Sequence, residues 1–115
     1  MPNVGNLKAQ VLEIISQHVG QDYAITAGEI AAIIDVSDHE VRQVVKDLRK
    51  EGVLVLSTWK GYFMPENHDE WEAFRNKYLR PRAMEILQMA RAMAQTAQKR
   101  WGAAEDDFPG LKRVQ

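Results

Sequence analysis

The chain has 115 residues, of which 45% are hydrophobic and 27% charged, with no cysteine and a net charge of −1 at pH 7. This length favours one domain, and the apolar content excludes a wholly disordered protein. The lack of cysteine excludes disulfides, thiolate catalysis and zinc sites built on sulfur. No apolar run approaches the ~20 residues that span a bilayer, and residues 1–4 lack the organisation of a signal peptide. We therefore expect a cytoplasmic protein without a membrane segment.

The first predicted element is an amphipathic helix. Apolar residues recur at helical spacing over residues 7–19, with Asn6 placed as the N-cap and Gly20 as the end of the helix. Residues 21–25 are too few for another helix. They predict a brief strand or an extended connector.

Two capping boxes follow in close succession. Thr26 and Ser37 each begin the pattern Ser/Thr-x-x-Glu, in which a hydroxyl and a carboxylate satisfy unpaired backbone N–H groups at the start of a helix. A short apolar stripe follows the first box, and a second stripe over residues 41–48 follows the other before Gly52 ends it. A turn around residues 35–36 would join these helices, which is the pattern of a helix-turn-helix.

A β-hairpin is predicted directly after the third helix. Residues 53–58 are β-branched and apolar, residues 59–61 form a turn that ends in glycine, and residues 62–64 can pair back as a second strand. Pro65 cannot donate to a strand ladder and closes the hairpin. Helix, capped helix, capped helix and hairpin is the element order of a winged helix.

On these residues the chain resembles the winged helix-turn-helix superfamily over residues 6–64, with residues 48–54 as the transition from helix to strand. The continuation from Gly61 through an acidic cap into a long basic helix is similar to small winged-helix regulatory or replication proteins of phages and prophages. The expected fold is mainly α, with a small β-hairpin wing and a long C-terminal helix. The resemblance implies that the protein binds double-stranded DNA.

The third helix would be the recognition helix, and the resemblance implies that its exposed face enters the major groove. Arg can pair with guanine, Gln with adenine, and Lys with guanine or phosphate. Hydroxyl groups at helix starts and a lysine at the wing can contact phosphates. The residues expected to bind DNA are Thr26, Ser37, His39, Arg42, Gln43, Lys46 and Lys60.

An alternative interpretation treats these side chains as the solvated face that any surface helix has. Arg49 and Lys50 are also left for solvent or DNA by this pattern, and four acidic residues in the same helix reduce its positive charge. At the turn of the wing, Trp59 is expected to pack on the base of the hairpin. Tyr62 and Phe63 point to opposite faces of a strand, so one of them should be core.

The C-terminal region predicts a long helix that is interrupted once. Asn67 is placed to cap a helix beginning near Asp69, with acidic residues at the positive end of the helix dipole. Its first apolar stripe, expected to pack on the winged-helix core, is Trp71, Phe74 and Tyr78. Pro81 costs about 3 kcal/mol or more inside a helix, which predicts a kink or break near residues 79–80.

Beyond this break, apolar residues alternate steps of four and three, the heptad pattern of a helix-helix seam. The seam residues are Leu79, Ala83, Ile86, Ala90, Met93 and Ala97. Small side chains at every second position would let two helices approach closely, so we expect a two-fold homodimer. The alternatives are that the stripe packs on its own domain or binds another protein.

Positive charge is concentrated in two stretches. Residues 37–62 hold five basic and four acidic residues, and the C-terminal stretch, residues 75–101, holds seven basic residues and one acidic residue. These bases form either the solvated outer face of a dimerisation helix or additional phosphate contacts. The expected organisation is a winged helix-turn-helix domain at 1–66, a helical dimerisation segment at 67–101 and a flexible tail at 102–115.

Enzyme chemistry finds no support in the sequence. The three histidines lie on different predicted elements without metal-ligand spacing, and no phosphate-binding loop or nucleophile elbow is present. We therefore expect no catalytic site, metal or cofactor. The function predicted is a dimeric, sequence-specific transcriptional regulator with its third helix in the major groove. The alternative is a winged-helix interaction module in a phage-like replication or assembly complex, bound through the C-terminal helix.

Overall fold

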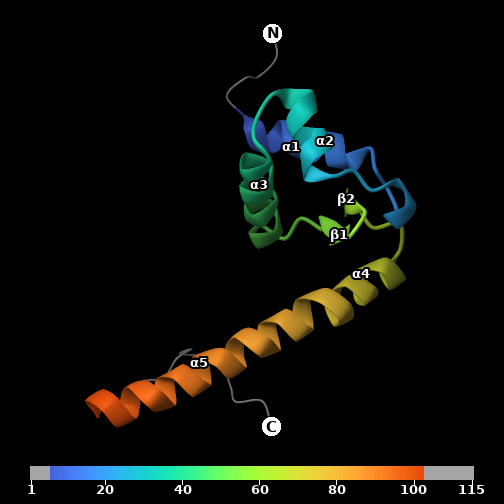
Figure 1. Cartoon of the computed structure of the whole chain (residues 1–115). Helices are drawn as coiled ribbons and strands as arrows, with labels where there is room; N and C mark the ends of the chain where they lie inside the picture. Colours follow the sequence, from blue (N-terminus) through green and yellow to red (C-terminus); the bar gives the residue numbers. More distant parts are fainter. Residues whose placement is uncertain (1–5, 103–115) are drawn as a thin grey trace. The chain divides into compact units, whose positions relative to one another are not determined.

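The structure is a computed structural model that describes residues 6–102 of the chain. In chain order its elements are α1 (Leu7–Ser16), the 3-10 helix η1 (Gln21–Tyr23), α2 (Ala27–Ile34), α3 (Asp38–Lys50), β1 (Leu56–Thr58), β2 (Gly61–Phe63), α4 (His68–Phe74), the π-helical turn η2 (Arg75–Leu79) and α5 (Arg80–Trp101). The predicted mainly helical fold with a small hairpin and a long C-terminal helix is confirmed (Figure 1).

The chain divides into two compact units, Met1–Arg75 and Asn76–Gln115, called here the N-terminal unit and the C-terminal unit. The N-terminal unit contains α1 to α4 and the hairpin, and α5 forms most of the described part of the C-terminal unit. The division falls later in the chain than the boundary expected after residue 66. Apart from Gly102, the tail expected to be flexible lies outside the described residues.

Helix α1 begins as predicted, because the Asn6 side chain accepts a hydrogen bond from the N–H of Ala9 at 2.9 Å. It ends at Ser16, earlier than its apolar pattern indicates. The residues that follow are drawn into extended pairing instead. Met64 N–H donates to the carbonyl of His18 at 2.8 Å, and Gly20 N–H donates to the carbonyl of Met64 at 2.9 Å.

Both predicted capping boxes are present. The N–H of Glu29 donates to Thr26 Oγ1 and that of Glu40 to Ser37 Oγ, each at 3.1 Å, while the two carboxylates accept from the backbone of Thr26 and Ser37. Between the two helices, Asp35 has φ +57°, a left-handed conformation that Asp adopts more easily than most residues. Only residues 35–37 separate α2 from α3, so the turn between the two helices is short.

The hairpin has a two-residue turn. Its register pairs Leu56 with Phe63, Ser57 with Tyr62 and Thr58 with Gly61, which leaves Trp59 and Lys60 as the turn. Figure 1 shows the hairpin continuing from the C-terminal end of α3. Phe63 is 3% exposed and Tyr62 is half-buried, so the prediction that one of them is core is confirmed.

A third segment pairs with the hairpin. The N–H of Ile25 donates to the carbonyl of Tyr62 at 2.8 Å, and that of Tyr62 donates to the carbonyl of Ile25 at 2.7 Å. Gly61 sits beside this bridge with φ +129°, and a Cβ there would lie 2.4 Å from the Ile25 oxygen. Only glycine fits this close approach. The connector predicted at residues 21–25 is thus a 3-10 turn followed by a bridge to β2.

A single core cluster holds the N-terminal unit together. Its buried members are Val11, Ile15, Ile25, Ala27, Ile30, Ala31, Val41, Val45, Leu48 and Val55. They come from α1, α2, α3 and the segments that lead into α2 and β1. Phe74 of α4 is also buried, as expected from the apolar stripe, whereas Trp71 is half-buried.

The interruption expected near residues 79–80 is a change of helix type. Asn67 caps α4 through a 2.9 Å hydrogen bond from Glu70 N–H, and α4 gives way to the π-helical turn η2 before α5 begins at Arg80. Pro81 has no N–H and its ring would clash with the carbonyl of residue 77, so a regular α-helix cannot continue through this point. A wider turn relieves that conflict.

Candidate nucleic-acid interface

Helix α3 has two faces of opposite character. Val41, Val45 and Leu48 are buried in the core. Spacings of three and four residues put the exposed side chains on the opposite face. The exposed side chains of α3 that carry hydrogen-bond donors are called here the α3 stripe, namely His39, Arg42, Gln43, Lys46 and Lys50. The acidic residues Asp38, Glu40 and Asp47 of this helix are exposed too. The structure therefore brings together four of the residues expected to bind DNA, and Lys50 extends the stripe by one helical turn.

The charges around the α3 stripe are only partly compensated. Arg42 Nη2 lies 3.7 Å from Asp38 Oδ2, and both side chains are more than half exposed. An exposed pair of this kind is worth under about 1 kcal/mol and is easily exchanged for another anion. Glu40 is held in its capping box, and Glu51 pairs with Lys8 of α1. Arg42 is thus available to a stronger acceptor such as a base edge or a phosphate.

The helix starts offer less to a phosphate than the sequence indicates. Ser37 Oγ accepts from Glu40 N–H and donates to the Glu40 carboxylate at 3.1 Å, so its hydroxyl is fully used within the capping box. Hydrogen bonds from the Ser37 backbone and hydroxyl lower the pKa of Glu40, and those from Thr26 lower the pKa of Glu29. Each helix N-terminus therefore already holds a carboxylate, which would repel a phosphate.

Arg49 does not point to solvent or DNA, contrary to the expectation from its helix position. Its Nε donates to the carbonyl of Val55 at 2.8 Å, and its Nη2 donates to Ser57 Oγ at 3.0 Å. The guanidinium also lies 5.1 Å from the ring centroid of Phe74 and 5.8 Å from that of Tyr62. Arg49 consequently fastens the hairpin and α4 to the end of α3. The sequence could not reveal this, because the contacts form only once the hairpin is in place.

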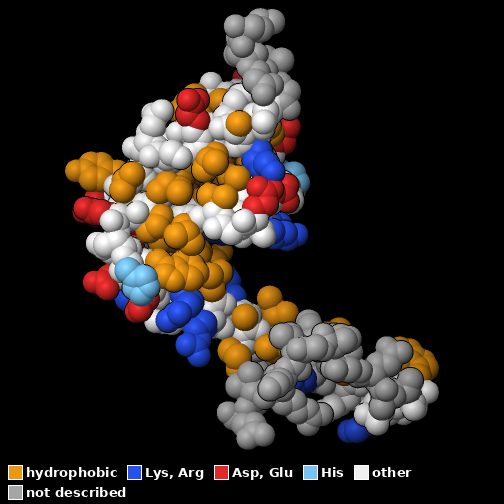
Figure 2. Space-filling model, turned by 180° about the vertical axis from the view of Figure 1, so that it is seen from behind, with side chains coloured by type: hydrophobic (Ala, Val, Ile, Leu, Met, Phe, Trp, Pro, Cys, Tyr) orange, Lys and Arg blue, Asp and Glu red, His pale blue; other side chains and the backbone are white. Residues whose placement is uncertain are grey.

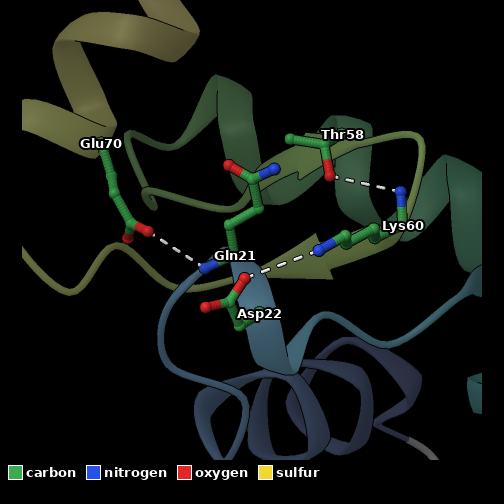
Figure 3. A network of polar contacts seen from close by, with 5 residues as sticks. All are labelled: Gln21, Asp22, Thr58, Lys60 and Glu70. Carbon is green, nitrogen blue, oxygen red and sulfur yellow. Dashed lines mark hydrogen bonds and ion pairs between the residues drawn. The ribbon is translucent and has the colours of Figure 1, made fainter.

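The turn of the hairpin presents an exposed aromatic beside a cation. Trp59 is 88% exposed and does not pack on the hairpin base, which corrects the expectation from sequence. Lys60 Nζ lies 5.6 Å from the Trp59 ring centroid and 3.5 Å from Asp22 Oδ1, as Figure 3 shows for the ion pair.

The expected dimerisation residues lie on or next to α5. Leu79 is the last residue of η2, and the other five follow within α5. No described residue of α5 is buried, and the exposed fractions of Ile86 and Met93 are 54% and 72%. Large apolar side chains exposed along one helix are typical of a surface that binds another protein or a second copy of the chain.

Among residues 6–102, no group of three or more His, Cys, Asp or Glu side chains could hold a metal ion. No helix in this described range is long and apolar enough to cross a membrane. On the face of the N-terminal unit seen in Figure 2, hydrophobic side chains occupy the middle, and acidic and basic side chains lie at the edges.

Comparison of the chain with protein-family models, with curated proteins and with solved structures found no match. The functional interpretation therefore depends on the geometry of the chain itself.

Proposed function

We propose that this protein is a sequence-specific, double-stranded DNA-binding protein of the winged helix-turn-helix superfamily, similar to the small regulators of phages and prophages. The observation that carries the proposal is the α3 stripe. It places Arg, Gln and Lys side chains together on the face of α3 opposite the core, after a short turn from α2. These are the side chains that pair with guanine, adenine and phosphate in the major groove.

The roles within the site follow from the chemistry of each side chain and from its place in the α3 stripe. Arg42 and Gln43 would read base edges, and Lys46 and Lys50 would contact phosphates. His39 lies at the N-terminal end of the stripe, the end of a recognition helix that approaches the bases. Lys60 would reach the DNA backbone from the wing. Thr26 and Ser37 would act by fixing the starts of α2 and α3 rather than by binding phosphates.

A dimer would give the protein the affinity that one small module lacks. The chain has a net charge of −1, so non-specific attraction to DNA is weak. Two recognition helices joined through α5 would bind the two halves of a palindromic site. In this proposal the protein is a homodimeric transcriptional regulator in the cytoplasm.

The test begins with selection of bound sequences from random duplex DNA by the full-length protein. With a selected duplex, we expect Arg42→Ala and Gln43→Ala each to weaken binding about tenfold and to relax preference at a base position. Lys46→Ala should weaken binding evenly across sequences and reduce the salt dependence by about one counterion.

The matched control is Gln17→Ala, which removes an exposed Gln that lies outside α3. It should bind like the wild type. Selection without enrichment, or unchanged affinity in both the Arg42 and the Gln43 variants, would contradict the proposal.

A second candidate is a winged-helix module that joins a replication or assembly complex through α5. The balanced charge and the exposed apolar residues of α5 favour it. It predicts negligible affinity for duplex DNA at physiological salt and a heteromeric complex that is lost on Ala90→Glu.

A further inference from the structure

The most exposed large hydrophobic side chain among the described residues belongs to the turn of the hairpin. Trp59 is 88% exposed, and the other members of that class range from 37% to 72%. Burial of apolar surface is favourable, so an indole left in water contributes less to stability than a buried indole. Nothing in the packing of the N-terminal unit requires a Trp at this position.

The backbone beneath Trp59 is held in place. The N–H of Lys60 donates to Thr58 Oγ1 at 3.2 Å across the turn. Directly below, two hydrogen bonds join Tyr62 to Ile25, and Gly61 allows the close approach of these two segments. Because the backbone is already ordered, a ligand that stacks on the indole would pay little conformational entropy.

The neighbouring cation has an exchangeable partner. Lys60 Nζ is 3.5 Å from Asp22 Oδ1, at the limit of hydrogen bonding, and the Asp22 side chain is 87% exposed (Figure 3). The Lys60 Nζ is 5.6 Å from the Trp59 ring centroid, so a phosphate that replaced Asp22 would bind beside the indole. Sites that bind unstacked nucleotides combine an aromatic surface for the base with a cation for the phosphate.

We propose that Trp59 is a base-stacking wedge. When the N-terminal unit binds DNA, the indole stacks on an unpaired or partly unstacked base, and Lys60 exchanges Asp22 for a neighbouring phosphate. This inference rests on the proposed function and extends it, since the protein would distort DNA as well as read it. A single aromatic on a two-residue turn suits insertion between bases, whereas a protein hot spot needs a surrounding ring of contacts that exclude water.

The experiment compares two DNA probes that carry the selected sequence, an intact duplex and a duplex with one bulged nucleotide. Unstacking is already complete at the bulge, so the full-length wild type should bind the bulged probe about tenfold more tightly. Trp59→Ala should abolish that preference, and Trp59→Phe should retain most of it. Trp101→Ala, which removes an exposed Trp from the C-terminal unit, is the matched control and should retain it fully.

Fluorescence gives an independent readout. Stacking on a base should quench part of the Trp emission in the wild type and in Trp101→Ala, but not in Trp59→Phe. The ratio of the affinities for the two probes, rather than either affinity alone, reports the contribution of base stacking.

Three results would overturn the wedge. Equal, salt-dependent binding of both probes by the wild type would reject it and leave the proposed function standing. An absence of binding to either probe would reject both. Retention of the probe preference by Trp59→Ala would also reject it, and a changed oligomeric mass in that variant would show that the exposed indole contacts a second copy.

Discussion

The two units of the chain use their apolar residues in opposite ways. Every buried hydrophobic residue among residues 6–102 lies in the N-terminal unit, and α5, the longest helix of the chain, has none. Met93 and Trp101, two large apolar residues of α5, are each 72% exposed. The first unit therefore has its own core, whereas the apolar residues of α5 are exposed or half-buried.

The difference separates folding from association. Helices derive most of their stability in water from tertiary packing, so α5 should be stabilised chiefly by whatever covers its seam. The N-terminal unit should fold whether or not that surface is covered. Substitutions that affect one property and spare the other can test this distinction.

The largest effect is expected from the core of the N-terminal unit. Ile30→Ala removes a fully buried side chain and should lower the free energy of unfolding by about 4 kcal/mol. Ile33→Ala is the control, because Ile33 lies on the same helix and is 62% exposed; its effect should stay within about 0.5 kcal/mol. Urea unfolding measured by circular dichroism gives both values. Equal losses would mean that Ile33 is covered in solution.

The next effect concerns association alone. Ala90→Glu places a charge in the proposed seam and should weaken the dimer about a hundredfold, or about 3 kcal/mol. Gln88→Glu puts the same charge on another side of α5 and should leave the dimer intact. Sedimentation velocity over a concentration series measures both. A wild-type monomer at micromolar concentration, or a dimer that survives Ala90→Glu, would contradict self-association through this face.

A smaller effect is expected where α3 holds the hairpin. Arg49→Ala removes two hydrogen bonds to residues 55 and 57 and should cost about 2 kcal/mol of stability. Lys50→Ala, at the next position, removes an exposed cation and should cost little. Thermal unfolding compares them. Similar stabilities would indicate that the hairpin is held by its backbone pairing alone.

The smallest effect is the pH dependence of the two capping boxes. Because folding lowers the pKa of Glu29 and Glu40, their stabilisation is complete above the ordinary value of 4.5 and is lost as the pH falls through the lowered values. Melting temperature should decline below about pH 4.5, and less steeply when both are changed to Gln. Glu13→Gln removes a carboxylate outside any capping box and serves as the control. An unchanged slope in the double variant would show that other carboxylates govern acid unfolding.

Local features of the fold were predictable from sequence. The capping boxes at Thr26 and Ser37, the Asn67 cap and the interruption before Pro81 depend on residues within a few positions of one another. Their geometry is set by short-range hydrogen bonding and sterics. The α3 stripe likewise follows from helical spacing, because Lys50 lies four residues after Lys46 and therefore on the same face.

Features that depend on distant residues were not predictable. Arg49 occupies a position that helical spacing leaves exposed, but its acceptors arrive with the hairpin. Val19 follows the apolar pattern of α1, yet Met64 draws its segment into extended pairing. Trp59 is expected to pack because an aromatic residue at a turn usually packs on the base of the hairpin, yet its side chain is 88% exposed. Each difference arises from tertiary contacts that override a local preference.

The two-residue turn of the hairpin also has a consequence for engineering. Arg49 fastens β1 to α3, and Ile25 fastens β2 to the segment before α2, so both strands are held by contacts outside the turn. A longer loop could be inserted between Trp59 and Lys60 at a modest cost, about 0.6 kcal/mol for each doubling of length. This site is where a grafted basic loop or a reporter peptide could be added without rebuilding the core.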